Sequence, residues 1–338
     1  MSEWRIYQGT GEPHDWDLPD PPGWRAFGVE PSLDTPPVVA GQKAERRLGA
    51  LARAVSYRPG ADEVEMVNAA LYLRRPLLVT GKPGTGKSTL AQNVAYELGL
   101  GPPLTWPVTS KSTREQGLYS YDALARLHDA GLARETGRDS VLDIGAYIRL
   151  GPLGTALLPY RLPRVLLIDE LDKSDIDLPN DLLAIFEEGE YDIPELTRIA
   201  ETQPVSRVRT HDGADLVPIT AGLVRCAEFP LVIITSNGER DFPPAFLRRC
   251  LQLQLKEPRR DRLESIVRAH LGDEGLERGE ELIDRFISKR REVDLATDQL
   301  LNAIFLAFHP EWGGDKDRLV RLVLQQLNPT DSAAERSG

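Results

Sequence analysis

The sequence is poor in cysteine, and this scarcity excludes two common ways of stabilising a small fold. Its 338 residues include two cysteines, Cys226 and Cys250. Neither lies in a Cys-x-x-Cys pair or near a suitably spaced histidine, so the pattern predicts neither a zinc site nor a disulfide framework. We expect both to be buried, small apolar side chains in a protein of a reducing compartment.

Long apolar runs and a basic, apolar start are also missing. The first residues, MSEWRIYQGTG, contain neither region of a secretory signal. No apolar run approaches the length that spans a bilayer. From these absences we expect a cytoplasmic protein without membrane insertion.

Positive charge is outweighed by negative charge. Lys and Arg total 41 against 52 Asp and Glu, which gives a formal net charge of -11. A chain with this charge repels nucleic acid and anionic membranes as a whole, so nucleic acid is not an expected partner. Two short basic runs, Arg259-Arg260 and Lys289-Arg290-Arg291, are more simply explained as solvated helix ends.

Residues 1–42 differ in composition from the rest, because prolines are frequent there and Trp4, Trp16 and Trp24 lie among them. Proline fixes the backbone and removes a hydrogen-bond donor, which predicts an extended arm without a core of its own. Disordered tails are poor in aromatic residues, so we expect this arm to dock on a surface. A partner could provide that surface, but the protein's own body is favoured, since terminal segments become ordered chiefly on the domain they leave.

Residues 43–257 are predicted to form an α/β domain, residues 258–328 a small all-helical lid, and residues 329–338 a disordered tail. Five apolar segments, with helical periodicity between them, predict a five-stranded parallel sheet flanked by helices. These segments are Pro76–Thr80, Leu104–Val108, Val165–Ile168, Leu231–Thr235 and Leu251–Leu255. After Pro258, apolar residues recur only at helical spacing, which predicts the lid.

A glycine-rich segment follows the first predicted strand and opens a predicted helix over Lys87–Leu98. Its residues, with the next threonine, are Gly81, Lys82, Pro83, Gly84, Thr85, Gly86, Lys87, Ser88 and Thr89. In such a loop, backbone amides and the helix N-terminus converge on phosphate oxygens. We expect Lys87 to reach the β- and γ-phosphates of a nucleotide and Ser88 to bind Mg²⁺. A plain glycine-rich turn is the alternative, and the flanking strand and helix disfavour it.

Two adjacent carboxylates, Asp169 and Glu170, end the third predicted strand. Ligands of open α/β folds bind at the carboxyl edge of the sheet, where this pair is expected to lie. Asp169 is predicted to hold the Mg²⁺ shell, and Glu170 to orient and polarise the attacking water. A strand that merely runs into a polar loop would end in the same way, although the phosphate-binding loop upstream weakens that alternative.

Three further polar residues complete the candidate catalytic set. Asn237 ends the fourth predicted strand and could hydrogen-bond the water or the γ-phosphate, or else merely shape the following turn. Arg248 and Arg249 end a short predicted helix before the last strand. An arginine can neutralise transition-state charge on the γ-phosphate, from the same chain or from a neighbour. A salt-bridged surface pair is the alternative for both.

These motifs resemble those of AAA+ ATPases, most of all the MoxR-type branch, over residues 43–328. Other segments that resemble this branch are Gly151-Pro152-Leu153, Asp169-Glu170-Leu171-Asp172-Lys173-Ser174 and Leu182-Leu183-Ala184-Ile185-Phe186-Glu187-Glu188-Gly189. The resemblance implies a P-loop NTPase core with a helical lid, ATP and Mg²⁺ as cofactors, and an Arg249 finger that acts on the adjacent subunit's nucleotide. It also implies a homo-oligomeric ring, usually a hexamer, that remodels, assembles or gates a protein partner. Von Willebrand factor A proteins are common companions of this branch.

Two insertions fit this branch, and one expected residue is missing. Tyr119–Arg161 is long enough to contain an insert in the second helix. Asp212-Gly213 lies between the alternating segments Val205–Thr210 and Ala214–Ile219, which predicts a hairpin before the strand of Asn237. Many AAA+ lids carry an arginine at the start of their third helix, but Leu295–Gln299 contains none.

The residues leave other functions open. The chain could be a nucleotide-dependent binding module or a defence switch of a bacterial conflict system, in which ATP binding rather than turnover sets the state. A GTP-using subunit of a nucleic-acid translocase is a third option, which the acidic charge disfavours. Tyr57 and Arg58 precede the helix that leads into the first strand, where this family often contacts the adenine. An ordinary exposed pair is the alternative there.

Overall fold

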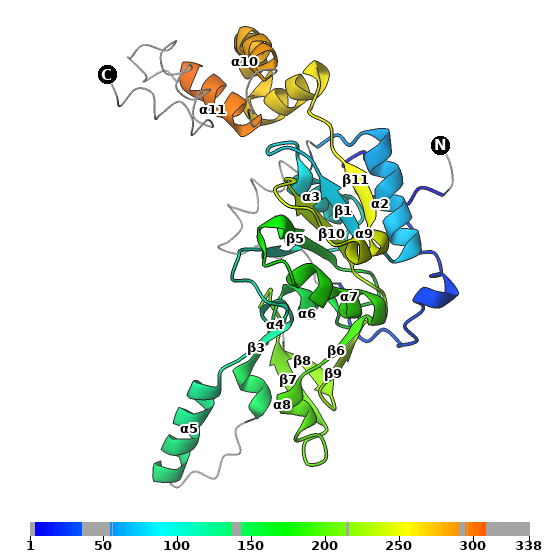
Figure 1. Ribbon diagram of the computed structural model, residues 1–338, viewed down its shortest axis with the longest axis vertical. Coiled ribbons are helices and arrows are strands. Elements are labelled where there is room, and N and C mark those ends of the chain that lie inside the picture. Colours follow the sequence, from blue (N-terminus) through cyan, green and yellow to red (C-terminus); the bar gives the residue numbers. More distant parts are fainter. Residues whose placement is uncertain are drawn as a thin grey trace.

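The structure is a computed structural model that describes residues 4–35, 55, 57–136, 143–213, 216–290, 295 and 297–308 (Figure 1). The predicted boundary between residues 42 and 43, residues 309–328 of the predicted lid and the tail 329–338 lie outside these residues. A helical lid lies at one end of the elongated molecule, an α/β core in the middle, and a smaller sheet with a projecting helix at the other end (Figure 1).

The core is a five-stranded parallel sheet with the strand order β11-β1-β10-β5-β2. Its strands are β1 (Leu77–Thr80), β2 (Leu104–Pro107), β5 (Val165–Asp169), β10 (Leu231–Ser236) and β11 (Leu251–Gln254). Each predicted strand is confirmed to within one residue at either end. The three central strands consist mainly of buried Leu, Val and Ile residues, as expected for a parallel sheet that is covered on both faces.

Helices cover both faces of this sheet, so the doubly wound prediction is confirmed. Alternate strand residues point to opposite faces: Leu77 and Val79 pack with α2 and α3, whereas Leu78 packs with α6, α7 and α9. These helices are α2 (Ala61–Leu73), α3 (Lys87–Glu97), α6 (Pro152–Ala156), α7 (Leu178–Glu188) and α9 (Pro244–Arg249). The helix predicted over Lys87–Leu98 is therefore confirmed as α3.

The insertions build a second, six-stranded sheet that the sequence did not reveal, with the order β3-β4-β7-β8-β9-β6. Its strands are β3 (Tyr119–Tyr121), β4 (Ile148–Leu150), β6 (Glu190–Asp192), β7 (Val205–Arg209), β8 (Leu216–Thr220) and β9 (Leu223–Arg225). The antiparallel β7–β8 pair confirms the predicted hairpin. β4 pairs with β7, so the insert in the second helix and the hairpin form one unit.

Short helices and turns complete the core and the insertions. They are α4 (Arg114–Leu118), α5 (Ala123–Thr136), α8 (Pro194–Thr197) and the 3-10 turns η1 (Gly23–Arg25), η2 (Ile144–Tyr147) and η3 (Leu171–Lys173). α5 projects away from the body between β3 and η2 (Figure 1). Within Tyr119–Arg161, the insertion contains β3, α5, η2 and β4, whereas α6 contacts β2 and β5 of the main sheet.

The described part of the lid consists of α10 (Arg260–Lys289) and α11 (Thr297–Phe308), which share a separate apolar core. Gly272 interrupts the helical backbone of α10 with φ 73° and ψ -179°, so α10 is two helices joined at a kink. The all-helical prediction holds for these residues. Within the described ranges, no helix is both long enough and apolar enough to cross a membrane.

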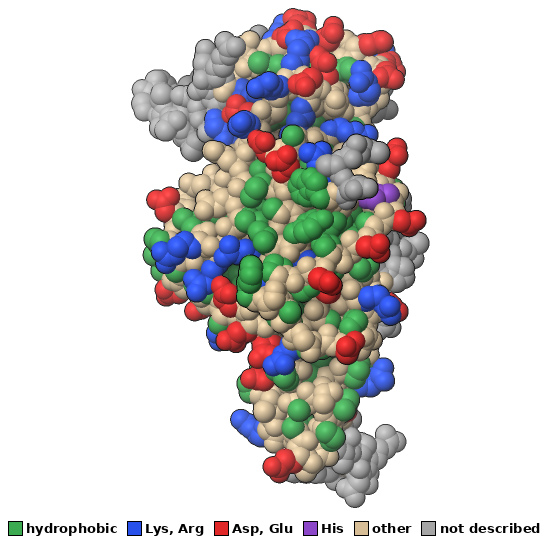
Figure 2. All heavy atoms as spheres, turned by 90° about the vertical axis from the view of Figure 1, so that its right-hand side faces the viewer, with side chains coloured by type: hydrophobic (Ala, Val, Ile, Leu, Met, Phe, Trp, Pro, Cys, Tyr) green, Lys and Arg blue, Asp and Glu red, His purple; other side chains and the backbone are tan. Residues whose placement is uncertain are grey.

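The N-terminal arm docks on the protein's own body over residues 4–35, as favoured from the sequence. The backbone amides of Ile6 and Tyr7 donate to the Asn68 side chain of α2, and the Tyr7 ring is fully buried. The amides of the next residues donate to the buried Glu97 carboxylate of α3. Figure 2 shows this side of the molecule, with apolar side chains gathered in its middle and charged side chains around them.

Both cysteines are buried and free, as expected. Burial raises the pKa of the Cys226 thiol to about 12 and that of the Cys250 thiol to about 12. Neither thiol is therefore reactive in the folded protein at neutral pH.

Candidate functional site

The glycine-rich loop lies between the carboxyl end of β1 and the first turn of α3. The φ angles of Gly81, Gly84 and Gly86 are 154°, 74° and 94°, which residues other than glycine rarely adopt. A Cβ atom at Gly81 would also lie 2.8 Å from the Leu255 carbonyl oxygen, and one at Gly86 would lie 2.8 Å from the Tyr57 ring. The glycines are thus required by both the backbone conformation and its close packing.

Lys87 folds back over this loop. Its ammonium group donates to the carbonyl oxygens of Gly81 at 2.6 Å and Lys82 at 3.0 Å, and to the Asn237 side-chain oxygen at 2.8 Å. Burial lowers the pKa of the Lys87 ammonium, and three nearby carboxylates, those of Asp172, Asp169 and Glu170, oppose this shift. The ammonium is therefore held as a cation among acids, at the position where phosphates of a nucleotide would lie.

Asn237 connects Lys87 to the carboxylate pair. Its amide nitrogen donates to Glu170 Oε1 at 3.2 Å, and Lys173 donates to Glu170 Oε2 at 2.7 Å. The Lys87, Asn237 and Glu170 side chains, which follow three different strands in the sequence, thus form one chain of hydrogen bonds. The structure brings these three predicted residues together at the carboxyl edge of the sheet.

Ser88 and Asp169 also meet, since the Ser88 hydroxyl donates to Asp169 Oδ1 at 2.8 Å. Thr235 of β10 donates to the same carboxylate oxygen at 2.7 Å and accepts the Glu170 amide at 2.8 Å. Glu170 has a left-handed backbone with φ 60°, which is uncommon for a residue with a side chain. Thr235 therefore fixes the Asp169 carboxylate and the backbone of Glu170, and the sequence analysis had not assigned it a role.

The Ser88 and Asp169 oxygens fit a Mg²⁺ site. Mg²⁺ binds oxygen ligands and in nucleotide sites takes one or two carboxylates, with waters and phosphate oxygens as the remaining ligands. One hydroxyl and one carboxylate, 2.8 Å apart beside the phosphate-binding loop, are the protein share of such a shell.

Asp172 is a further acid of this site that the sequence analysis quoted but left without a role. Its Oδ2 atom accepts the amides of Asn237 at 2.9 Å and Glu239 at 3.1 Å, and so orients the loop that carries Asn237. Its buried Oδ1 atom has no partner within the described residues. The Asp-Glu-Leu-Asp run was the available signal, because one turn of η3 places the third acid beside the loop that follows β10.

The lid contacts the glycine-rich loop directly. The Thr297 hydroxyl, at the start of α11, donates to the Gly84 carbonyl oxygen at 2.8 Å. Lys82 pairs with Glu257 at 3.0 Å, and Arg290 of the lid pairs with the same carboxylate at 3.2 Å. Where many lids carry an arginine, a threonine hydroxyl here reaches the loop.

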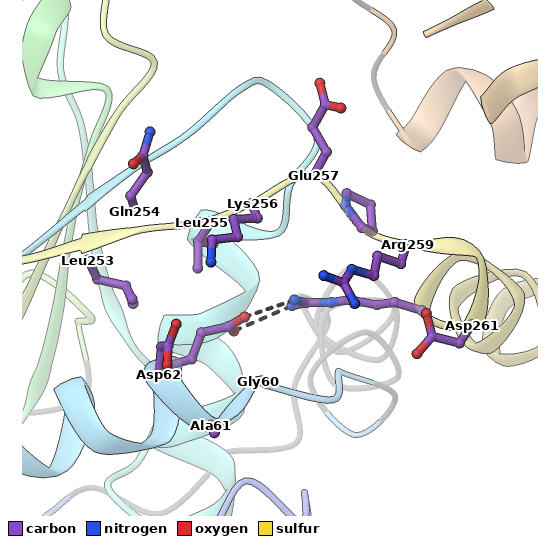
Figure 3. Close-up of a pocket in the computed structure, with 13 residues that line it drawn as sticks. Gly60, Ala61, Asp62, Leu253, Gln254, Leu255, Lys256, Glu257, Arg259 and Asp261 are labelled. Carbon is purple, nitrogen blue, oxygen red and sulfur yellow. Dashed lines mark hydrogen bonds and ion pairs between the residues drawn. The ribbon is translucent and has the colours of Figure 1, made fainter. Parts of the chain in front are cut away.

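A cavity of about 340 Å³ adjoins the loop where the core meets the lid. It is lined by the start of α2, the end of β11, the connecting residues Leu255–Pro258 and the start of α10 (Figure 3). Two of its lining residues form an ion pair between α2 and α10, with Arg262 Nη1 2.8 Å from Glu63 Oε1. Its size is in the range of small-molecule sites.

Tyr57 is buried between this cavity and the loop, so it is not part of an exposed Tyr-Arg pair. Its hydroxyl donates to Glu63 Oε2 at 2.5 Å, and the Arg262 guanidinium lies 5.0 Å from the centre of its ring. Burial raises the pKa of the Tyr57 hydroxyl. Its ring packs on Gly86, which places it beside the phosphate-binding loop.

Arg249 lies away from this site, at the opposite edge of the sheet. It precedes β11, which runs parallel to β1 with Leu251 beside Leu77, whereas the glycine-rich loop follows β1. The four residues of β1, or roughly 13 Å of strand, separate the two edges. Arg249 pairs with Glu187 at 2.7 Å, and Arg248 is exposed. In this conformation neither arginine therefore lies beside the chain's own glycine-rich loop.

Comparisons with known proteins agree with this arrangement. A family model described as AAA domain (dynein-related subfamily) matches residues 76–250, just over half of the chain. No curated protein matches the sequence. Two solved structures are similar: domain III of the Thermotoga maritima replication initiation protein DnaA, and C. elegans PCH-2.

The DnaA domain shares 17% identity with a TM-score of 0.36, over 85% of this chain and 93% of that chain. PCH-2 shares 15% identity with a TM-score of 0.35, over 96% of this chain and 75% of that chain. At these values neither likeness bears on function.

Proposed function

Since this chain belongs to the AAA domain family, in its dynein-related subfamily, we propose that it is a Mg²⁺-dependent ATP hydrolase of the MoxR type. In this proposal it works as a homo-oligomeric ring that remodels, assembles or gates a protein partner. The chemistry, the ring and the partner rest on different observations.

The hydrogen-bonded set at the carboxyl edge of the sheet supports hydrolysis. Lys87, Asn237 and Glu170 are joined by contacts of 2.8 and 3.2 Å, with Ser88 and Asp169 beside them. In the proposed mechanism, Lys87 leaves the loop carbonyls for the β- and γ-phosphates, and Glu170 accepts a proton from the attacking water that Asn237 helps to orient. Mg²⁺, held by Ser88 and Asp169, would neutralise phosphate charge.

The cavity at the junction of core and lid suits the base and ribose of the nucleotide. It lies beside the phosphate-binding loop, and Glu257, which lines it, pairs with Lys82 of that loop. Tyr57 packs on Gly86 between the two regions. A nucleotide bound in this way would contact the core, the connecting residues and the lid at once, and so couple its binding to lid position.

The place of Arg249 supports a ring. Because Arg249 lies far from the chain's own nucleotide site, the γ-phosphate that it could reach is that of a nucleotide bound to a neighbouring subunit. Head-to-tail contacts of this kind close into rings when the rotation between subunits allows it. The two insertions, joined in one sheet away from the lid, support the MoxR assignment, and a von Willebrand factor A protein is the proposed class of partner.

Steady-state ATP hydrolysis by single variants tests the chemistry. Lys87→Ala and Glu170→Gln should each lower kcat by about 10²- to 10⁴-fold, because each removes a group that acts on the phosphates or the water. The matched control is Glu239→Gln, which removes an exposed carboxylate close to the site. Full activity of Glu170→Gln would contradict the assigned role of Glu170.

Mixing two inactive variants tests the finger. Arg249→Ala retains an intact hydrolytic set, and Glu170→Gln retains an intact finger. If Arg249 acts on the neighbour's nucleotide, a mixture of the two should hydrolyse ATP although neither variant does so alone. Absence of any recovery, with both variants assembled, would exclude the finger in trans.

A further inference from the structure

A second cavity, of about 330 Å³, surrounds Arg249 at the amino edge of the main sheet. Trp24 and Arg25 of the N-terminal arm line it together with Arg75, Glu187 and Arg249. The arm therefore forms part of the surface that carries the proposed finger, although nothing in the sequence connects the two segments.

Arg25 fixes this part of the arm. Its side chain is buried and donates to the carbonyl oxygens of Arg74 at 2.6 Å, Phe186 at 2.8 Å and Glu187 at 3.2 Å. The guanidinium also lies 4.8 Å from the centre of the Phe229 ring. Four separate contacts hold Arg25 between the ends of α2 and α7, so η1, which contains Trp24, has a defined position.

Glu187 lies between the arm and the finger. One of its carboxylate oxygens is 2.7 Å from Arg249 Nε, and the other is 3.7 Å from Arg25 Nη1. Both Glu187 and Arg249 are partly exposed, with side chains 48% and 39% accessible. The pair is thus open to competition by another anion, whereas Arg25 is not.

Trp24 is the most exposed large apolar side chain among the described residues, at 82%. It lies beside the arginines of this cavity. The nucleotide site at the other edge of the sheet carries Asp169, Glu170 and Asp172, and a bound nucleotide would add the negative charge of its phosphates. One edge of the sheet thus carries a basic face with an aromatic side chain, and the opposite edge carries an acidic, phosphate-binding face. These two faces are complementary in a head-to-tail contact between two copies of the chain.

We propose that the Trp24–Arg25 segment belongs to the surface that a second copy of this chain covers. On this surface Glu187 pairs with Arg249 until the phosphates of the nucleotide bound by the second copy replace Glu187 as the partner of Arg249. The arm then has two roles: Trp24 contributes apolar contact, and Arg25 keeps Glu187 beside the finger. This inference rests on the proposed function, because it requires Arg249 to act on a neighbour.

The dependence of ATP hydrolysis on protein concentration tests the surface. Trp24→Ala should raise the concentration of half-maximal specific activity about tenfold, since exposed tryptophans that become buried are typical interface anchors. Leu124→Ala is the matched control, because Leu124 is 79% exposed on α5, far from this cavity, and should leave that concentration unchanged (Figure 1). Acrylamide quenching gives a direct readout of Trp24 burial. The part of the tryptophan fluorescence that is present in the wild type and absent in Trp24→Phe should become less quenched when ATP is added.

Glu187→Gln tests the competition. Removing the charge of an exposed pair should lower the half-activation concentration about two- to fivefold, because Arg249 no longer has to leave a carboxylate. An unchanged or higher value would overturn the role of Glu187, and an unchanged value for Trp24→Ala would overturn the role of the arm. If the wild type shows no ATP-dependent assembly and Arg249→Ala has full activity, the proposed function itself fails. If the wild type assembles with ATP and Arg249→Ala is inactive, but the Trp24 and Glu187 variants behave like the wild type, this inference alone fails.

Discussion

Replacing Glu97 by glutamine tests how the N-terminal arm is held on the domain. The Glu97 side chain is fully buried in α3, and its two oxygens accept three backbone amides of the arm. The distances are 2.6 Å from Gln8, 3.0 Å from Gly9 and 2.8 Å from Gly11. These three amides and the Thr10 hydroxyl, at 3.4 Å, meet one carboxylate and form a compact anchor, and glutamine preserves its shape but not its charge.

The expected loss follows from these contacts. The glutamine oxygen can still accept the Gln8 and Gly9 amides, but neutral hydrogen bonds are weaker than charge-assisted ones. The glutamine NH₂ group would then face the buried Gly11 amide, which loses its acceptor at a cost of about 1–3 kcal/mol. Because Gln8 is exposed and regains water, the total loss of unfolding free energy should be about 2–3 kcal/mol.

Urea unfolding followed by tryptophan fluorescence measures this loss. With an m value of about 3 kcal/mol per M, the midpoint should fall by about 0.8 M. Glu65→Gln is the control, since Glu65 also contacts the arm, through an exposed pair with Arg5 at 3.6 Å, and should change stability by at most about 0.5 kcal/mol. If Glu97→Gln shifted the midpoint no more than Glu65→Gln, the reasoning about the anchor would be refuted.

Three further outcomes are expected. Cys226 and Cys250 should resist a thiol reagent at pH 8 until urea unfolds the chain. Their pKa values are raised to about 12, so only about one thiol in 10⁴ is ionised at that pH. Rapid labelling of the folded protein would contradict their burial. Thr297→Val should increase amide exchange in α11 and the phosphate-binding loop, and Thr297→Ser should restore protection, since the hydroxyl donates to the Gly84 carbonyl oxygen. Asp212→Asn should lower stability by about 2 kcal/mol in urea unfolding, because the fully buried Arg164 guanidinium loses its charged partner at 3.2 Å; a change below about 0.5 kcal/mol would speak against that pairing.

The phosphate-binding loop and the carboxylate pair were readable from the sequence because their chemistry depends on local order. Gly81 to Ser88 must join a strand to a helix, and Asp169 must end a buried strand, so a short run of letters specifies each of them. The strands were predictable for the same reason, since a covered parallel strand is a continuous apolar run. Even the hairpin around Asp212-Gly213 is encoded in its turn residues.

Contacts between distant segments were not readable in this way. Thr235 supports the Asp169 carboxylate and Asp172 supports the loop of Asn237, each through hydrogen bonds to a distant segment, and no periodicity marks a supporting residue. The six-stranded sheet arises because β4 meets β7, which lie far apart in the sequence. Short strands of three residues carry too little pattern to predict such a pairing.

The sequence by itself determined the phosphate-binding chemistry, the parallel sheet and the helical character of the lid, because each is set by the order of neighbouring residues. Only the tertiary structure decided where the arginines and the arm lie. The parallel pairing of β1 with β11 places Arg249 at the edge opposite the loop, and Glu97 and Arg25 bring the arm from α3 to the finger. These relations depend on which strands pair and which side chains become buried together, and the packing of the whole chain settles both.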